Sequence, residues 1–311
     1  MRKNPVLVIA GPTASGKSAL AAQAAHDLNG VVLNCDSMQI YKDIPIIAAA
    51  PTEEEKMLAE HRLFEIYDCD KRGNVVDWLN LCAAEIRKLW AEKRLPVVVG
   101  GTGFYVEALL NGVTPIPETP IEVRKQLQAR INQEGLENLY KELQQKDAEI
   151  AAKLNPNDKT RIVRALEVIA ATGQKLSEWY KKPLIKKLPE AHFITVKIMP
   201  SLDVIATRCC LRLDKMVDEL GVLAEIEKLL NKGVDENMPA MKALGVPELS
   251  LFIKGQMLLP EALDLAKLHT RQYAKRQRTW LKNKMSADIV FENVYEGQKD
   301  YLQQIFNVIK L

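Results

Sequence analysis

A glycine-rich loop near the start of the chain has the residue types that hold a polyphosphate. The segment GPTASGKS fits the pattern G-x-x-x-x-G-K-[ST] at Gly11, Gly16, Lys17 and Ser18, and it follows the apolar run 6–10. Glycines let successive backbone N–H groups point at phosphate oxygens beside the positive end of the following helix. Lys17 adds a positive charge, and the Ser18 hydroxyl is suited to ligate magnesium. The loop predicts polyphosphate binding without separating a nucleoside triphosphate from another diphosphate.

Two further turns are expected beside this loop. Asp36 follows the apolar run 31–34, and the glycine turn 100–103 follows the run 96–99. A carboxylate at Asp36 could ligate magnesium through water, act as a general base or cap the next turn. The glycine turn is interpreted as a second anion-binding nest. Because the carboxyl ends of parallel strands meet at one edge of a sheet, both turns should face the phosphate loop.

Basic residues late in the chain predict contacts with phosphate. Arg208 and Arg212 are four residues apart, so they share a helix face and could neutralise a departing phosphate group or form surface ion pairs. Residues 267–284 hold seven basic residues and no acidic one. This surplus indicates contact with nucleic-acid phosphates, with a solvated helix face as the alternative. Tyr273 and Trp280 in the same stretch are interpreted as core residues rather than stacking platforms.

Alternating strand and helix patterns predict how these residues are positioned. Apolar runs at 6–10, 31–34, 96–99, 193–198 and 288–291 are separated by helical segments, which is typical of a buried parallel sheet. Three prolines within 115–120 mark a linker, and residues 121–189 are helical throughout. We therefore predict an α/β fold with a P-loop NTPase-like parallel sheet flanked by helices and an all-helical insertion domain. The predicted core is 1–114 with 191–311, and the insertion is 115–190.

Bulk properties narrow the class. The chain has 311 residues, 47% of them hydrophobic, which suits one or two domains. No apolar run approaches the ~20 residues of a membrane span, and the first residues lead straight into a strand, so we expect no signal peptide. Five scattered cysteines form no CxxC pair, which argues against zinc and disulfides. We expect a cytoplasmic protein that acts as a monomer and contacts no membrane.

Six segments together resemble the bacterial tRNA dimethylallyltransferase family, in the family's order and over essentially the whole chain. Members of that family are P-loop proteins with a helical insertion. They transfer a dimethylallyl group from its diphosphate to N6 of the adenosine 3′ of the anticodon. The segments are GPTASGKS from Gly11, CDSMQIYK from Cys35, HRLFEIYD from His61, PVVVGGTGFYVEALLNG from Pro96, LNPNDKTRIVRALEV from Leu154 and KRQRTW from Lys275.

The resemblance implies roles for particular residues. Asp36 would be the general base, Ser18 would ligate Mg²⁺, and Arg212 would steady the leaving diphosphate together with Lys17, with Arg208 as a further partner. The donor diphosphate would be held by Gly11, Pro12, Thr13, Ala14, Ser15, Gly16, Lys17, Ser18 and Thr102. The anticodon stem-loop of tRNA would be contacted by Asp36, Ser37, Met38, Gln39, Thr160, Arg161, Ile162, Val163, Arg164, Lys275, Arg276, Gln277, Arg278, Thr279, Trp280, Leu281 and Lys282.

Two stretches depart from the family pattern. Where the family usually has I-G-T-A-K/R-P, residues 46–51 read IIAAAP, so the basic residue is lost at Ala50. Where it usually has I-G-Y-K/R-E, residues 244–248 read LGVPE, so an aromatic and a cation are lost at Val246 and Pro247. Both differences concern tRNA contacts and leave the donor site intact.

Two other functions fit the same residues. A P-loop nucleotide or small-molecule kinase would share the loop and the parallel sheet, and it would turn over ATP with a small acceptor. A non-catalytic RNA-binding module would bind tRNA and yield no product. Dependence on an isoprenoid diphosphate separates the transferase from both.

Overall fold

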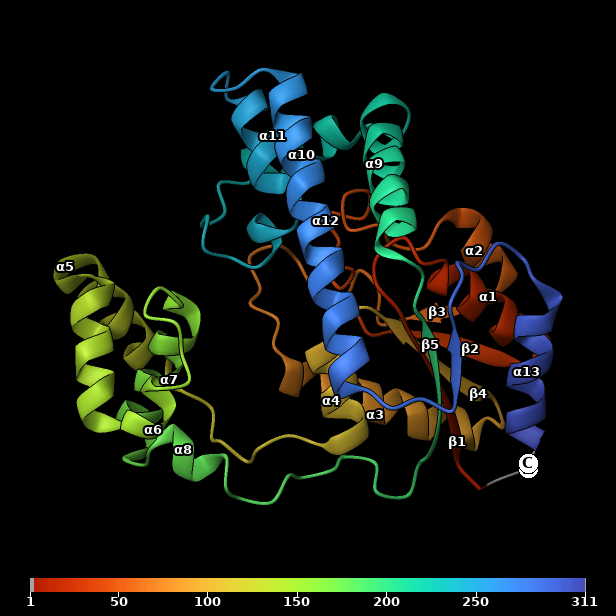
Figure 1. Ribbon diagram of the computed structural model, residues 1–311, viewed down its shortest axis with the longest axis horizontal. Coiled ribbons are helices and arrows are strands. Elements are labelled where there is room, and N and C mark those ends of the chain that lie inside the picture. The colour runs from red at the N-terminus through yellow and green to blue at the C-terminus, as the bar shows by residue number, and fades with distance from the viewer. Residues whose placement is uncertain (1–2, 311) are drawn as a thin grey trace. The chain divides into compact units, whose positions relative to one another are not determined.

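A six-stranded, wholly parallel sheet forms the centre of the larger of two compact units (Figure 1). The computed structural model describes residues 3–310, so Met1 and Arg2 of the predicted strand-leading N-terminus lie outside the described residues. The strands lie in the order β3-β2-β4-β1-β5-β6. Their bounds are β1 Pro5–Ala10, β2 Gly30–Asn34, β3 His61–Arg62, β4 Leu95–Gly100, β5 His192–Ile198 and β6 Ile289–Phe291.

The α/β fold class and all five predicted strands are confirmed. The central strands β1, β2 and β4 are almost entirely buried because helices cover both faces of the sheet, as their continuous apolar sequences indicated. The edge strand β3 was not predicted. It has only two residues, His61 and Arg62, neither of which is apolar, so no hydrophobic pattern marks it.

Helices pack on the sheet and extend beyond its carboxyl edge. Side chains of α1 and α13 share one hydrophobic core with β1, β4 and β5, while α9 and α12 lie side by side (Figure 1). Helices α2 and α11 were not predicted. The helices of this unit are α1 Lys17–Asp27, α2 Glu53–Leu58, α3 Val75–Ala91, α4 Gly103–Asn111, α9 Leu202–Asp218, α10 Val222–Asn231, α11 Val246–Ile253, α12 Leu259–Lys284 and α13 Lys299–Lys310, with a short 3₁₀ turn at Ala240–Lys242.

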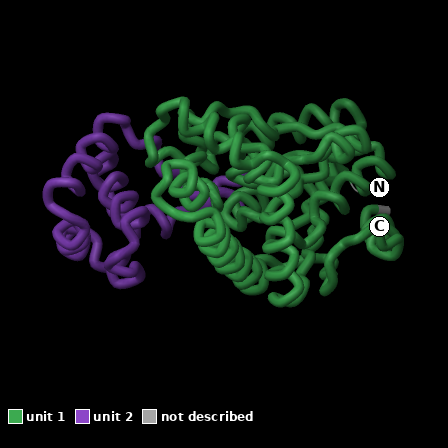
Figure 2. Tube along the Cα trace, turned by 90° about the horizontal axis from the view of Figure 1, so that it is seen from above, with its two compact units in different colours: residues 1–110, 187–311 green, residues 111–186 purple. Residues whose placement is uncertain are grey.

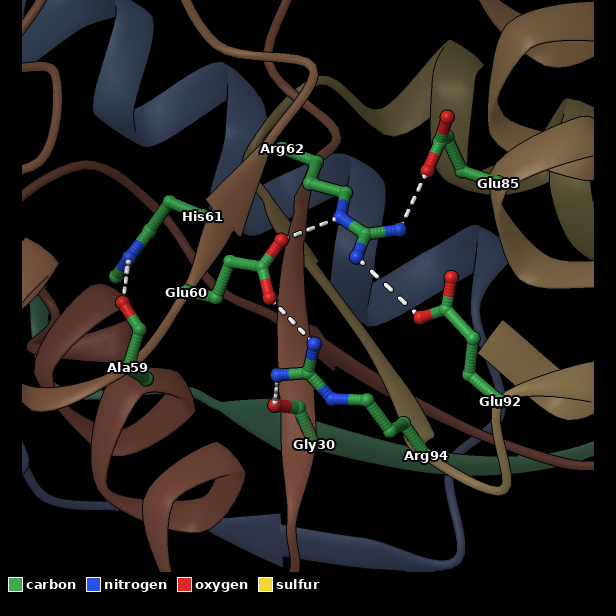
Figure 3. Close-up of polar contacts among 8 residues, drawn as sticks. All are labelled: Gly30, Ala59, Glu60, His61, Arg62, Glu85, Glu92 and Arg94. Carbon is green, nitrogen blue, oxygen red and sulfur yellow. Dashed lines mark hydrogen bonds and ion pairs between the residues drawn. The ribbon is translucent and has the colours of Figure 1, made fainter. Parts of the chain in front are cut away.

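An ion-pair network holds the edge strand β3 in place (Figure 3). The Arg62 guanidinium donates to Glu60 at 2.7 Å, to Glu85 at 2.9 Å and to Glu92 at 3.4 Å. Arg94 also pairs with Glu60, so two arginines share one carboxylate. Because several charges restrain one another, such a network orders side chains better than an isolated surface pair does. Backbone N–H groups of the chain that leaves β3 then donate to the carbonyls of residues 39 and 40.

The smaller unit, residues 111–186, is helical (Figure 2). Its core is formed by apolar residues of four helices, with Leu139, Leu143 and Ile162 fully buried. The buried Asp147 carboxylate accepts the N–H groups of Ile150 and Ser177 and so joins two helix starts. The larger unit comprises residues 1–110 and 187–311. The four helices are α5 Ile121–Lys146, α6 Ala148–Ala151, α7 Lys159–Thr172 and α8 Leu176–Trp179.

From residue 3 to residue 310, no helix combines the length and the apolar character that a membrane span requires.

Candidate active site

Two of the three loops at the carboxyl edge of the sheet, the phosphate loop and the Asp36 loop, line a cavity of about 820 Å³. The phosphate loop follows β1, the Asp36 loop follows β2, and the glycine turn 100–103 follows β4. Helices α9 and α12 close the cavity from the side. Its lining residues that could do chemistry include Thr13, Lys17, Ser18, Asp36, Arg208, Arg212, Tyr273, Arg276 and Gln277.

The phosphate loop is formed and presents its lysine. Gly16 has a φ of 85°, a left-handed conformation that glycine adopts without steric cost, and α1 begins at the next residue. The Lys17 ammonium donates to the Pro12 carbonyl at 3.3 Å and is only 9% exposed. Burial lowers the pKa of Lys17 to about 8; nearby Asp36 opposes this shift and Arg212 adds to it. A bound anion would replace the hydration that this cation has lost.

Asp36 is oriented by its own loop. Its N–H donates to the Asn34 side-chain oxygen at 2.7 Å, and its Oδ1 accepts the Met38 N–H at 3.0 Å. The Asn34 carbonyl in turn accepts the Trp78 indole N–H at 2.7 Å, so a side chain of α3 holds the end of β2. Among the described residues, none donates to Asp36 Oδ2. One carboxylate oxygen therefore holds the loop, and the other is left for a substrate.

Arg212 and Arg208 of α9 approach the phosphate loop differently. Arg212 donates to the Thr13 hydroxyl at 2.6 Å and lines the cavity. Arg208 donates through Nε to the Ala14 carbonyl at 3.0 Å, and its other end pairs with Glu296. Both arginines line the cavity, and of these two only Arg212 has no carboxylate partner within 4 Å in the described chain. The sequence left open that these arginines form surface ion pairs, and Arg208 does form one, with Glu296.

Family and structural comparisons agree on what this chain resembles. The family model described as IPP transferase matches residues 39–284. The chain belongs to the IPP transferase family. It is 40% identical over 282 residues to a tRNA dimethylallyltransferase of Bradyrhizobium sp., covering 91% of each chain. It is 39% identical over 300 residues to a tRNA dimethylallyltransferase of Zymomonas mobilis, covering 94% of this chain and 95% of the relative. The predicted resemblance is confirmed.

Solved structures give the same result. A tRNA isopentenylpyrophosphate transferase from Bacillus halodurans superposes with a TM-score of 0.68 at 32% identity, covering 99% of this chain and 96% of the other. A eukaryotic dimethylallyltransferase, crystallised acting on tRNA, gives a TM-score of 0.81 at 26% identity, with coverage of 98% and 78%. The phosphate loop precedes the residues that the family model matches, so its assignment depends on the motif and the geometry above.

Two sequence motifs, GGTG at residues 100–103 and KRQ-x-TW at residues 275–280, pack against one another. The Gln277 side chain accepts the Thr13 N–H at 2.9 Å and donates to the Gly101 carbonyl at 2.9 Å. A Cβ at Gly101 would lie 2.4 Å from Gln277 Nε2, and one at Gly103 would lie 2.4 Å from the Trp280 ring. The prediction of an anion nest in this turn is therefore corrected: these glycines are needed so that α12 can pack closely.

A methyl group at Gly103 should therefore destabilise the fold. We expect Gly103→Ala to lower the free energy of unfolding by about 1–3 kcal/mol, because the Trp280 ring must move. Thermal melting checks this. The control is Gly103→Ala made in a Trp280→Leu background. Without the ring, Gly103→Ala should lower the free energy of unfolding by less than it does in the presence of Trp280. Equal costs of Gly103→Ala with and without Trp280 would contradict the packing explanation.

Thr102 has a different role from the one predicted. Its hydroxyl accepts the Ser37 N–H at 3.1 Å and lies within hydrogen-bond reach of Tyr273. It is not among the residues that line the cavity. Thr102 therefore positions the Asp36 loop rather than the donor. Burial raises the pKa of Tyr273 to about 12, with Asp36 adding to the shift.

The predicted tRNA residues divide by exposure. Asp36, Ser37, Met38, Gln39 and Arg276 line the cavity, and Lys275, Thr279 and Lys282 are exposed along α12. One residue of α12 is corrected, because the Leu281 side chain is buried in the protein and has no surface for RNA. Gln277 is largely buried but also lines the cavity, and Arg278 is half-buried and donates through Nε to the Pro200 carbonyl at 2.8 Å. Contacts of these two residues with tRNA stay predictions.

The helical unit gives a similar division. Thr160 and Arg161 are exposed on the first turn of α7, whereas Ile162 is fully buried in the core of this unit and has no surface for RNA. Ile162 is therefore corrected as well. Val163 is half-buried, and Arg164 donates to the Thr119 hydroxyl at 2.6 Å.

Sequence reasoning missed the cavity wall formed by residues 47–50. The Glu225 carboxylate accepts the N–H groups of Ile46 and Ile47 at 2.7 and 2.9 Å, and the Gln39 amide donates to the Ala48 and Ala49 carbonyls. Burial raises the pKa of Glu225. No local pattern marks this glutamate, because its partners lie about 180 positions away. The loop that lacks a cation at residue 50 is thus built into the site.

Proposed function

We propose that this protein is a tRNA dimethylallyltransferase that modifies N6 of the adenosine 3′ of the anticodon and releases diphosphate. Family membership supports the reaction class. The observation that carries the proposal is the shared cavity, in which a phosphate loop with Lys17 and Arg212 faces the oriented carboxylate of Asp36. An anion site and a proton acceptor in one cavity are what alkylation of an amine by an allylic diphosphate requires.

The donor's diphosphate would lie in the phosphate loop. Backbone N–H groups at the start of α1, the Lys17 ammonium and the Arg212 guanidinium would neutralise it. As the bond between the allylic carbon and the diphosphate oxygen breaks, negative charge grows on that oxygen and these groups stabilise it. The electron pair of that bond leaves with the diphosphate.

Asp36 would receive the proton. The adenine amine forms the new bond to the allylic carbon and becomes acidic as it does so. Asp36 Oδ2 is available for that proton, while Oδ1 keeps the loop in place by its bond to Met38. The products are the N6-alkylated adenosine, diphosphate and a proton.

Magnesium fits the donor set at the phosphate loop. The Ser18 hydroxyl lines the cavity next to Lys17, and Mg²⁺ prefers oxygen ligands while keeping several waters. Residues 3–310 contain no cluster of three or more His, Cys, Asp or Glu side chains suited to a metal, so the remaining ligands would be diphosphate oxygens and water. When bound, the ion would supply further positive charge at the leaving group.

Ser18→Ala should raise the magnesium concentration needed for half-maximal transfer. The variant removes one oxygen ligand and leaves Lys17 and the loop backbone unchanged, so we expect an increase of about tenfold. A magnesium titration of initial rates measures it. Ser18→Thr keeps the hydroxyl and is the matched control, and a magnesium dependence equal to wild type in Ser18→Ala would contradict the ligand role.

Lys275 is expected to contact a tRNA phosphate. It is exposed on α12 and has no acidic partner within 4 Å among the described residues. Lys275→Gln should weaken tRNA binding and reduce the slope of log K against log salt by about 0.7–0.9, as loss of one phosphate contact does. Lys299→Gln, which removes the same charge from α13, is the control. An unchanged slope for Lys275→Gln would remove this residue from the interface.

Mass spectrometry of tRNA nucleosides tests the function. Purified protein would be incubated with unmodified tRNA, magnesium and dimethylallyl diphosphate, and in parallel with ATP in place of the donor. A dimethylallyl gain on adenosine beside the anticodon supports the proposal. Phosphoryl transfer from ATP to a small acceptor would indicate a kinase, and tRNA binding without product would indicate a non-catalytic module. The cytoplasmic location and the monomeric state remain predictions.

A further inference from the structure

The outer side of the phosphate loop is covered by a segment from the far end of the chain. Residues 293–298, which we name the clamp, connect β6 to α13 and pass the start of α1 (Figure 1). The Tyr295 N–H donates to the Ser15 carbonyl at 3.1 Å. A Cβ at Gly16 would lie 2.3 Å from the Tyr295 carbonyl oxygen, so the two backbones are in direct contact.

A second tie reaches the neighbouring peptide unit. Arg208 of α9 donates to the Ala14 carbonyl, and Glu296 of the clamp pairs with the same guanidinium. Ala14 itself has a φ of 62°, which is unusual for a residue other than glycine and has to be maintained by its surroundings. Two consecutive carbonyls of the phosphate loop are thus held, one by the backbone of the clamp and one by Arg208, whose side chain also borders the cavity.

Holding the carbonyls fixes the N–H groups. In a trans peptide the C=O and the following N–H point in opposite directions. The Ser15 carbonyl points at Tyr295, so the Gly16 N–H points away from the clamp, on the side where Gly16 lines the cavity. An anion-binding loop depends on this orientation, because each N–H that turns away removes a donor from the phosphate.

The clamp itself is firmly anchored. Tyr295 is buried in the core formed by α1, α13 and the sheet, and its ring lies 5.8 Å from that of Tyr301. The Gln298 side chain accepts the Glu296 N–H at 2.7 Å and donates to the Val294 carbonyl at 3.2 Å. The Glu296 carboxylate, by contrast, is 57% exposed, so it can be changed without opening the core.

We propose that the clamp and Arg208 form a positioning device for the donor diphosphate, in which Glu296 holds Arg208 on the Ala14 carbonyl. Arg208 acts through the loop and does not touch the leaving group, unlike Arg212. The inference rests on the proposed function in taking a diphosphate as the ligand of the loop. It assigns a role in substrate binding to a segment that lies about 280 residues from the loop in sequence.

Binding of inorganic diphosphate distinguishes this role from direct contact. If Arg208 neutralised the diphosphate itself, releasing it from Glu296 would strengthen binding or leave it unchanged, since a competing carboxylate is removed. If Arg208 acts through Ala14, releasing it loosens the loop and weakens binding. The two mechanisms therefore predict opposite signs for Glu296→Ala.

The experiment is calorimetric titration of the full-length chain with inorganic diphosphate and magnesium. Glu292→Ala is the matched control, because it removes an exposed carboxylate just before the clamp. We expect Glu296→Ala to weaken diphosphate binding about fivefold, with a KM for dimethylallyl diphosphate that rises equally, an unchanged KM for tRNA and the melting temperature of the control. Binding by Glu296→Ala that equals or exceeds the control overturns the clamp alone. Failure of the wild-type chain to bind diphosphate overturns the proposed function and the clamp with it.

Discussion

Replacing Asp36 with asparagine is expected to lower the rate of transfer to tRNA by about 10²–10⁴-fold, the usual contribution of a general base. The amide cannot accept the proton that the adenine amine loses. It can still accept the Met38 N–H through its oxygen, so the loop that Asp36 Oδ1 holds should keep its shape. The loss should therefore appear in the chemical step and not in folding.

Single-turnover rates and tRNA affinity separate these effects. The tRNA dissociation constant of Asp36→Asn should stay within about threefold of wild type, because phosphate contacts supply most of the binding energy. Asp36→Glu is a second comparison, since it keeps a carboxylate and moves it by one methylene. Near-normal turnover by Asp36→Asn would exclude Asp36 as the base, and a parallel loss of tRNA binding would make it a binding residue.

The sheet and its loops were predictable because their signals are local. Continuous apolar runs mark strands buried on both faces, and the spacing of Gly11, Gly16, Lys17 and Ser18 is set by how one loop curls around a phosphate. The rule that ligands lie beyond the carboxyl ends of parallel strands then placed Asp36 beside that loop. The structure bears this out, since Lys17 and Asp36 line one cavity.

The contacts that the sequence could not predict are long-range. Gln277 was predicted only as a tRNA contact, and its side chain also links Thr13 to Gly101, which no sequence pattern indicated. The glycine turn 100–103 was interpreted as an anion nest, yet Gly101 and Gly103 make room for α12. In each case the residue type fits several roles, and only a partner more than 150 positions away decides among them.

Arg208 and Arg212 show the same limit most clearly. Their spacing places both on one face of α9 and suggests equal roles. Arg208 pairs with Glu296, whereas Arg212 reaches Thr13 and has no carboxylate within 4 Å among the described residues. Both arginines line the cavity and donate to the phosphate loop, so one turn of helix separates an arginine that is paired with a carboxylate from one that is not.

Arg212→Met should lower the rate of transfer by about 10²–10³-fold, as loss of a group that stabilises the leaving charge does. Arg212 and Lys17 bring two positive charges into one cavity, and burial together with this repulsion lowers the pKa of Lys17. Such an arrangement is unfavourable in the free protein and becomes favourable when a diphosphate arrives. Removing Arg212 should therefore raise the melting temperature of the ligand-free chain while reducing the further rise that inorganic diphosphate produces.

Thermal melting with and without inorganic diphosphate and magnesium, combined with single-turnover rates, tests both parts. Arg212→Lys is the matched comparison. It keeps the charge and loses the planar fork that reaches the Thr13 hydroxyl, so its rate should lie between wild type and Arg212→Met. A ligand-free Arg212→Met that melts lower than wild type would mean that Arg212 holds the fold. A variant with full diphosphate stabilisation and a normal rate would mean that the leaving group is neutralised by Lys17 and the loop alone. Opposite changes in stability and rate are what an arginine kept for the leaving diphosphate requires.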